Sequence, residues 1–304
     1  MTFTEIAAQS GVPEAATGGV PRRPPGAIRS AMRMWRTRIG MLLVGVVIFL
    51  AVFGPSLAPN NGRVAVGSGK PFDPDADGAL FGSGYLGSDV WSRFLNGGRA
   101  ILITATIATM LAIAVGAGLG LLAAYSRGTL DNVIMRSLDI VLAFPSLLLA
   151  LVIFTTYGVE NWLIVLVVAG TTTPRIARVV RGATVPVVER DFVGAAEALG
   201  ESRWFIITRE LLPNVTAPLL VEASLRLAYS IALISTLGFL GFTESVNAPN
   251  WGVMVQEGRA TLEIQPWAVM IPVIAIAILT IGAGLIADGI TRANAGIDRG
   301  RADA

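Results

Sequence analysis

The sequence contains no cysteine and no histidine among its 304 residues. Without cysteine the chain can form neither a disulfide nor a thiolate metal site. Without histidine it lacks the most common general base and the most common transition-metal ligand in proteins. A catalytic function is therefore disfavoured, and we expect no enzyme activity, no bound metal and no cofactor.

Charge is also scarce, since 14% of the residues are charged and 53% are hydrophobic, whereas soluble domains carry about a quarter charged residues. The deficit is concentrated in stretches such as 39–59 and 100–126, which contain no charged residue. A bilayer core requires about 20 consecutive apolar residues. The fold class predicted is therefore an all-α polytopic membrane protein.

Six apolar stretches predict about six transmembrane helices. They cover about Ile39–Leu57, Ile101–Tyr125, Val133–Tyr157, Trp162–Val180, Val215–Phe242 and Trp267–Ala287. Phe144-Pro145 in the third span and Pro218 in the fifth are expected to kink their helices, and the Thr-Thr-Thr-Pro stretch at 171–174 is expected to interrupt the fourth.

Basic residues are distributed unequally between the two sides of the membrane. With the N-terminus in the cytoplasm, 17 of the 23 Lys and Arg residues lie in inner segments and 5 lie in outer segments. Because cytoplasmic loops carry an excess of Lys and Arg, both termini are predicted to be cytoplasmic. Arg175 and Arg178 belong to this inner set, at the expected end of the fourth span, where arginine side chains can extend to the headgroups.

Composition divides the chain into a tail and a membrane domain. Residues 1–28, rich in proline, glycine and alanine, are predicted to form a disordered cytoplasmic tail. Residues 29–304 are predicted to form the transmembrane domain. Its outer loop, 60–99, and its inner loop, 181–214, are too long to be simple connectors, and long ordered loops tend to carry function.

Two charged pairs fall in or near the spans. Glu222 and Arg226 lie four residues apart, so they share a helix face and can pair. Two roles stay open for them: a structural ion pair near the inner half of the membrane, or a pair that lines a transport pathway. Asp139, three residues after Arg136, is predicted to form a local salt bridge with it.

Two glycine-rich stretches invite different interpretations, one as a helix-packing motif and one as a phosphate loop. Gly116 and Gly120 lie one turn apart in the second span, which lets two helices approach closely. The stretch 67–70 (Gly-Ser-Gly-Lys) is not a phosphate loop, because Val64 stands where that motif needs glycine and Pro71 stands where it needs Ser or Thr. If ATP drives this protein, a separate subunit must bind it.

The outer segment 243–265 contains Trp251 and is followed by Trp267. Aromatic residues at this depth suit the membrane interface. A surface that touches a partner is an equally weighted interpretation.

The inner loop holds the most informative local pattern. Residues 191–205 begin with an alanine-rich helix that Gly200 is expected to end as a C-cap. A second short helix follows, and Pro213 is expected to end it before the fifth span. Two interpretations stay open: a rigid knob that docks into a groove on another protein, or two amphipathic helices lying on the membrane surface.

Within this loop, Ala195, Ala196, Gly200, Leu212 and Pro213 stand in a recognisable pattern. The pattern resembles the Glu-Ala-Ala coupling loop of bacterial ABC importer permeases, through which an ATPase moves the pore. Where that family has its leading glutamate this chain has Gly194, and the nearby Glu197 is a candidate substitute. The resemblance implies the following ATPase-coupling residues: Ala195, Ala196, Glu197, Gly200, Arg203 and Pro213.

A second segment, 82–93 (GSGYLGSDVWSR), followed by Gly97 and Arg99, narrows the family. It resembles the segment before the second span in dipeptide, oligopeptide and nickel permeases, in the second of their two paired permease proteins. The resemblance covers roughly residues 30–290. It implies a homologous permease subunit, two ATP-binding subunits, an extracytoplasmic substrate-binding protein and a place in the bacterial cytoplasmic membrane, in contact with lipid and with no nucleic acid.

The main alternative is a secondary transporter or channel that acts without an ATPase. Such a protein would have inverted repeats and an intramembrane ionisable relay. We find no convincing internal repeat, and only Glu222 and Arg226 lie deep in a span. The substrate stays open between dipeptides, longer peptides, glutathione and nickel.

Overall fold

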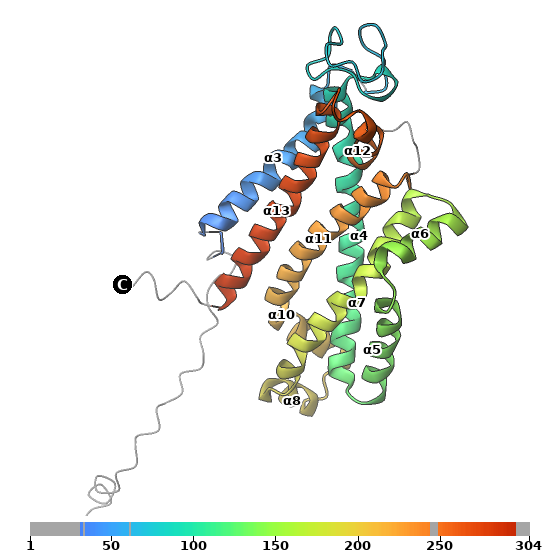
Figure 1. Ribbon diagram of the computed structural model, residues 1–304. Helices are drawn as coiled ribbons and strands as arrows, with labels where there is room; N and C mark the ends of the chain where they lie inside the picture. Colours follow the sequence, from blue (N-terminus) through green and yellow to red (C-terminus); the bar gives the residue numbers. More distant parts are fainter. Residues whose placement is uncertain (1–30, 33, 61, 244–248, 296–304) are drawn as a thin grey trace, which may run out of the picture.

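A computed structural model describes residues 31–32, 34–60, 62–243 and 249–295 (Figure 1). These residues are helical and contain no strand, apart from two isolated bridges in the outer segment, Ala65–Ser88 and Ser83–Asp89. The all-α fold class is thus confirmed. The predicted tail 1–28 lies outside the described residues.

Five helices are long and apolar enough to cross a membrane. They are α3 (Trp35–Leu57), α4 (Val90–Ser126), α7 (Asn161–Val188), α11 (Thr216–Phe239) and α13 (Trp267–Ala295). The remaining expected span is divided into α5 (Thr129–Leu142) and α6 (Ser146–Tyr157), which are bent by 78° relative to each other. The described chain therefore has five long spans and one bent pair.

Proline acts differently at the two predicted kinks. Pro145 stands immediately before the first residue of α6 with extended backbone, and the chain breaks there instead of bending gently. Pro218 lies in the first turn of α11, where backbone N–H groups have no helical partner in any case. The kink predicted at Pro218 is therefore wrong.

The interruption predicted in the fourth span is also wrong, because α7 continues through Pro174 to Val188. The hydroxyls of Thr172 and Thr173 donate to main-chain carbonyls one turn earlier in the helix, at 2.7 and 2.9 Å, so these polar groups are satisfied inside it. Arg175 and Arg178 consequently lie in the middle of α7, not in its last turns. The first residues of the predicted inner loop, 181–188, are the end of this helix.

Helix α5 packs beside α7 through ion pairs. Arg181 holds Asp131 through two hydrogen bonds of 2.6 and 2.5 Å, and Arg178 donates to Asp139. The predicted local bridge from Asp139 to Arg136 is wrong, because the carboxylate faces the neighbouring helix. These pairs explain how arginines are accommodated in a long apolar helix.

Small residues allow the closest helix contacts, as the sequence predicted for the second span. A Cβ added at Gly116 would come within 2.8 Å of Ile176, and one at Gly120 within 2.5 Å of the Ala177 carbonyl oxygen. The α4–α7 pair is the most extensive helix contact in the described structure. Helices α3 and α13 form the second pair, with Gly40 packed against Gly282.

Helix α4 begins at Val90, well before the expected start of its span, because Asp89 caps it by accepting hydrogen bonds from Trp91 N and Ser92 N. Its 37 residues give a length of about 55 Å, which exceeds the hydrocarbon core of about 30 Å. The surplus carries α4 into the outer cap that the outer segment forms with α12 (Trp251–Gly258) and η3 (Arg259–Thr261), at the top of Figure 1.

The outer cap is held together by buried side chains. Trp251 is 1% exposed, stacks on Phe94 and donates its indole N–H to the Phe94 carbonyl at 2.9 Å. Both predicted roles for this tryptophan, at the membrane interface or against a partner, are wrong, because it lies in the core of the cap. Arg93 and Glu257 form a buried ion pair nearby, with N–O distances of 2.8 and 3.0 Å.

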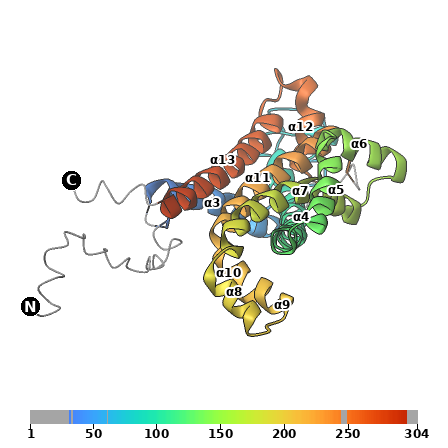
Figure 2. The ribbon, with the colours of Figure 1, turned by 90° about the horizontal axis from the view of Figure 1, so that it is seen from below.

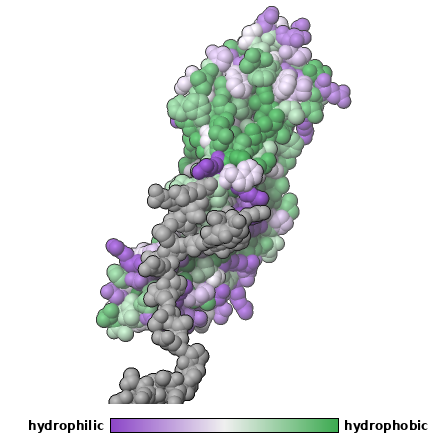
Figure 3. Space-filling model, turned by 90° about the vertical axis from the view of Figure 1, so that its left-hand side faces the viewer, coloured by the Kyte–Doolittle hydropathy of each residue, from purple (hydrophilic) through white to green (hydrophobic). Residues whose placement is uncertain are grey.

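The face formed by α3 and α13 is suited to lipid. Figure 3 shows hydrophobic side chains covering the upper part of this face, below a hydrophilic end. Large apolar side chains of α3 such as Leu42, Phe49 and Phe53 are more than half exposed. A polar solvent would disfavour so continuous an apolar surface, whereas hydrocarbon does not.

Candidate functional site

The inner loop forms a compact helical knob at one end of the molecule. It consists of α8 (Asp191–Ala198), α9 (Arg203–Phe205), the π-helical turn η2 (Ile206–Leu211) and α10 (Leu212–Asn214). Figure 2 shows α8 and α9 projecting beyond the bundle of long helices.

Gly200 ends α8 as predicted. Its φ is +79°, in the left-handed region that favours glycine. The amides of Gly200 and Glu201 donate back to the carbonyls of Glu197 and Ala196 at 3.0 and 3.1 Å, which is the Schellman arrangement of a helix C-terminus. Ser202 then caps α9 by accepting from Phe205 N. The turn between the two short helices is therefore sharply defined.

An apolar cluster anchors the knob to the long helices. Val193, Ile206 and Leu211 are at most 1% exposed and pack with Leu121 of α4 and Ile176 of α7. Burying three such side chains stabilises the attachment by roughly 1.5–3 kcal/mol each. The knob is therefore packed directly against α4 and α7.

The tip of the knob carries exposed apolar side chains. Leu199 is 83% exposed and Trp204 is 74% exposed, on either side of Gly200. Soluble surfaces rarely present such residues together unless a partner covers them. Sequence inspection did not select either as a coupling residue, although an apolar residue next to a helix-ending glycine in a charged loop was a usable signal.

The predicted coupling residues separate into two groups. Ala195, Glu197, Gly200 and Arg203 are exposed around the tip. Ala196 is half-buried and packs against the anchoring cluster, and its part in coupling stays a prediction. Pro213 is exposed but lies inside α10, away from the tip, and the helix ends after Asn214, so its predicted role as the helix end is wrong.

Glu197 lies near one of the long helices. Its carboxylate interacts with the side chain of Tyr125, near the end of α4, with Arg203 close by. Gly194, in the place of the family's glutamate, has open space around the position of a Cβ. The suggestion that Glu197 replaces that glutamate stays a prediction, and Tyr125 is a candidate positioning residue that sequence inspection missed.

The predicted pair in the fifth span forms, with 2.7 Å between Arg226 Nε and Glu222 Oε1. Both side chains are largely buried, at 18% and 7% exposure. Arg226 and Arg175 both lie over the ring of Tyr229, with guanidinium carbons 6.0 and 5.4 Å from its centroid. The pair is thus part of a larger polar cluster between α7 and α11.

Removing one member of this pair should reduce the amount of assembled protein. Glu222→Gln or Arg226→Gln leaves one charge unpaired in a span, at a cost of roughly 2.5–3.5 kcal/mol. The double variant should recover part of the loss, measured by purification yield and thermal stability in detergent. The exposed Arg127–Glu189 pair, at the ends of α4 and α7, is the matched control, worth at most about 1 kcal/mol. Strictly additive single effects would mean that the two residues are not coupled.

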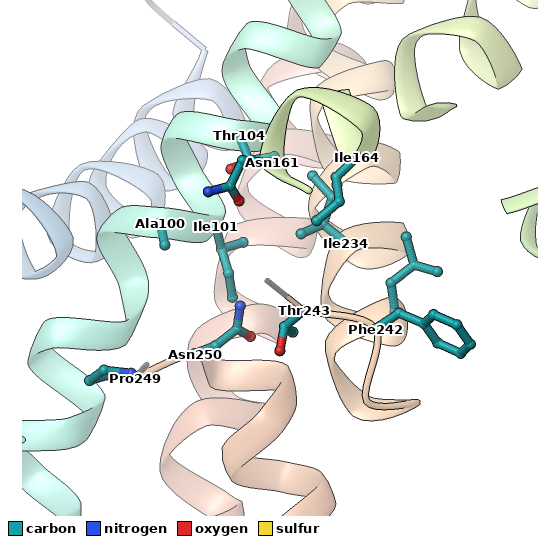
Figure 4. A pocket seen from close by; sticks show the side chains of 11 residues that line it. Ala100, Ile101, Thr104, Asn161, Ile164, Ile234, Phe242, Thr243, Pro249 and Asn250 are labelled. Carbon is teal, nitrogen blue, oxygen red and sulfur yellow. The ribbon is translucent and has the colours of Figure 1, made fainter. Parts of the chain in front are cut away.

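A second candidate site lies beside the outer cap. A cavity of about 120 Å³ lies between the outer parts of α4, α7 and α11 and the segment before α12. Apolar side chains such as Ile101 and Ile164 line it, with Thr104 and Asn161 at one end and Thr243 and Asn250 at the other in Figure 4. No charged residue lines it in the described part of the chain. Amides and hydroxyls in an apolar wall suit an uncharged polar ligand group, such as a peptide bond.

These features together define a multi-pass helical membrane component of a transport system. The chain belongs to the family described as binding-protein-dependent transport system inner membrane component, whose model matches residues 116–295. It is a membrane-spanning permease subunit of a binding-protein-dependent transport system.

Relatives agree with this assignment. The chain is 36% identical over 86% of its length to a putative peptide transport system permease protein of Brucella suis, of which 88% is covered. It is 32% identical to a dipeptide transport system permease protein of Alkalihalophilus pseudofirmus, with 83% of each chain covered. It is 31% identical to a glutathione transport system permease protein of Pectobacterium atrosepticum, with 82% and 83% covered.

Among solved structures, the MetNI methionine ABC transporter in an inward-facing conformation has a chain that superposes with a TM-score of 0.52 at 16% identity. The superposition covers 66% of this chain and 97% of the other. At this identity the likeness concerns the fold alone. The family model and the relatives confirm the family resemblance recognised in the sequence.

Proposed function

We propose that this chain forms half of a peptide-import pore, beside a homologous permease subunit. Two ATP-binding subunits would drive it, one of them docking on the α8–α9 tip, and an extracytoplasmic binding protein would deliver substrate to the outer cap. The observation that carries the proposal is the projecting tip with exposed Leu199 and Trp204, anchored to α4 and α7. The chain itself would bind no ATP and catalyse no reaction.

The substrate proposed is a short peptide. Relatives are named for peptides, dipeptides and glutathione, which share peptide bonds and free carboxylates. Among the described residues, the cavity near Thr104 and Asn250 offers hydrogen-bonding groups but no charge. This favours a peptide over a nickel ion, whose ligands are usually imidazole, thiolate or carboxylate.

Uptake by cells tests the substrate. Cells that lack this chain should lose uptake of a labelled dipeptide, and expression of the chain should restore it. Unlabelled dipeptides should compete with the label, whereas nickel should not. If no peptide uptake depends on the chain, the proposed substrate class is wrong.

The orientation proposed places both termini and the knob in the cytoplasm and the segment 60–99 outside. Ser202 lies in the knob and Ser68 in the segment between α3 and α4, and both are exposed. Figure 1 shows this segment and α8 at opposite ends of the molecule. Because the chain has no cysteine, each can be replaced singly by cysteine. Ser68→Cys should react with a membrane-impermeant thiol reagent in intact cells, and Ser202→Cys should react only after permeabilisation. Reaction of Ser202→Cys in intact cells would show that the orientation is the opposite of the one proposed.

The alternative of a secondary transporter is less well supported. The family is named for dependence on a binding protein, whereas a secondary transporter needs none. An ion-coupled protein would also leave the exposed tip at Leu199 and Trp204 without a partner.

A further inference from the structure

The polar cluster between α7 and α11 has an unusual composition. Tyr229 of α11 lies beneath two guanidinium groups, those of Arg175 and Arg226. Its hydroxyl is hydrogen-bonded to the hydroxyl of Ser146, the first residue of α6. Three separate helices therefore meet at one tyrosine, next to the break in the bent span.

The cluster carries one positive charge in excess. Glu222 neutralises Arg226. Arg175 forms no salt bridge among the described residues, and its Nη1 is buried without a hydrogen-bond partner. The nearby arginines do not change this balance, because Arg178 and Arg181 each hold an aspartate of α5. Arginine stays protonated in proteins, so the excess charge cannot be lost by titration.

The start of α6 adds to the positive potential. No side chain caps this helix, whose N-cap is Pro145. The unpaired N–H groups of the first turn carry the positive end of the helix dipole. In a membrane-spanning region, an unpaired arginine beside such a terminus is costly unless an anion accompanies it.

We propose that Arg175, with Tyr229 and the start of α6, binds the C-terminal carboxylate of a peptide in transit. This rests on the proposed function, and it specifies which part of the substrate the half-pore recognises. A guanidinium binds a carboxylate through paired, charge-assisted hydrogen bonds. Glu222 balances the charge of Arg226, which leaves Arg175 as the guanidinium of this cluster without a carboxylate partner among the described residues. Arg175 and Tyr229 are both partly exposed, beside the α5–α6 break.

The test compares a dipeptide with its C-terminal amide. Each is loaded on the binding protein beforehand, and uptake is measured in proteoliposomes that contain the whole complex, so that the rates report steps after delivery. Arg175→Gln should lower uptake of the free acid about tenfold, the value of one lost charge-assisted hydrogen bond. Uptake of the amide should stay within about twofold of its unmodified rate.

Two further variants keep the comparison decisive. Arg175→Lys keeps the charge but loses the planar fork, so the free acid should be affected less than by Arg175→Gln and the amide hardly at all. Arg178→Gln removes an arginine of the same helix that already has an aspartate and should not change the ratio of the two rates.

An equal fall for acid and amide would overturn the proposal and assign Arg175 to assembly, or to an acidic residue of the partner permease. An unchanged acid rate in Arg175→Gln would also overturn it. If the unmodified complex takes up neither ligand, the proposed function itself fails.

Discussion

Leu199→Asp at the tip of the knob should reduce association of the ATP-binding subunits at least about tenfold, with normal insertion of the chain into the membrane. The side chain is 83% exposed, so a polar replacement has little effect on folding. An apolar side chain buried at the centre of an interface is worth about 2 kcal/mol or more. Trp204→Ala should behave likewise. Co-purification of the ATP-binding subunits measures the effect.

Leu80→Asp is the matched control, because Leu80 is 74% exposed. It belongs to the segment between α3 and α4, which Figure 1 shows at the opposite end of the molecule from α8. It should leave co-purification unchanged. Gly200→Val tests the geometry of the tip separately, since a β-branched residue at φ +79° costs about 1–2 kcal/mol and should displace α9. Full association and uptake in all three tip variants would show that the knob does not couple an ATPase to the pore.

Glu257→Leu in the outer cap should destabilise the protein by about 3–5 kcal/mol, the usual consequence of removing one partner of a buried ion pair. Arg93 and Glu257 are only 6% and 7% exposed. Leucine offers no acceptor oxygen, so Arg93 keeps its charge and loses both of its contacts with residue 257. Burial raises the pKa of Glu257, although the guanidinium of Arg93 acts to lower it.

Replacing both residues should be much less harmful than replacing one. Arg93→Met with Glu257→Leu removes both desolvation penalties, and such replacements are often neutral or stabilising. Thermal unfolding of the purified complex should place the double variant near the unmodified protein and Glu257→Leu well below it. A Glu189→Gln variant, which breaks an exposed pair with Arg127, is the control. A double variant as unstable as Glu257→Leu would contradict this explanation.

The direction of the Glu257 pKa shift determines how the stability of the outer cap depends on pH. A carboxyl whose pKa is higher in the folded state favours folding in acid, and this contribution is lost as the pH rises through the folded pKa. Mild acid should therefore not weaken the outer cap through this residue.

Sequence patterns were sufficient wherever a feature is local. Long uncharged stretches predicted the spans, the spacing of Gly116 and Gly120 predicted a close helix contact, and Gly200 predicted a helix end. Each of these features depends on backbone geometry or on the surrounding solvent and not on distant residues. The family's loop pattern located the knob for the same reason.

Features that depend on partners from other helices were not predictable. Arg175 and Arg178 looked like the end of a span, because hydropathy does not reveal that aspartates of α5 neutralise the same helix face. Trp251 looked like an interfacial residue, because its burial depends on Phe94 of α4. Ala195 and Ala196 could not be told apart, since neighbouring helix positions differ by about 100° and only the anchoring cluster shows which one faces inward.

Uptake of a labelled dipeptide into proteoliposomes, with ATP or an ion gradient as the sole energy source, tests the account most directly. The complex should contain this chain, its partner permease, the ATP-binding subunits and the binding protein. Uptake should require ATP hydrolysis and the binding protein and should persist when all ion gradients are collapsed. Uptake driven by a proton or sodium gradient, by this chain without ATP, would contradict the account.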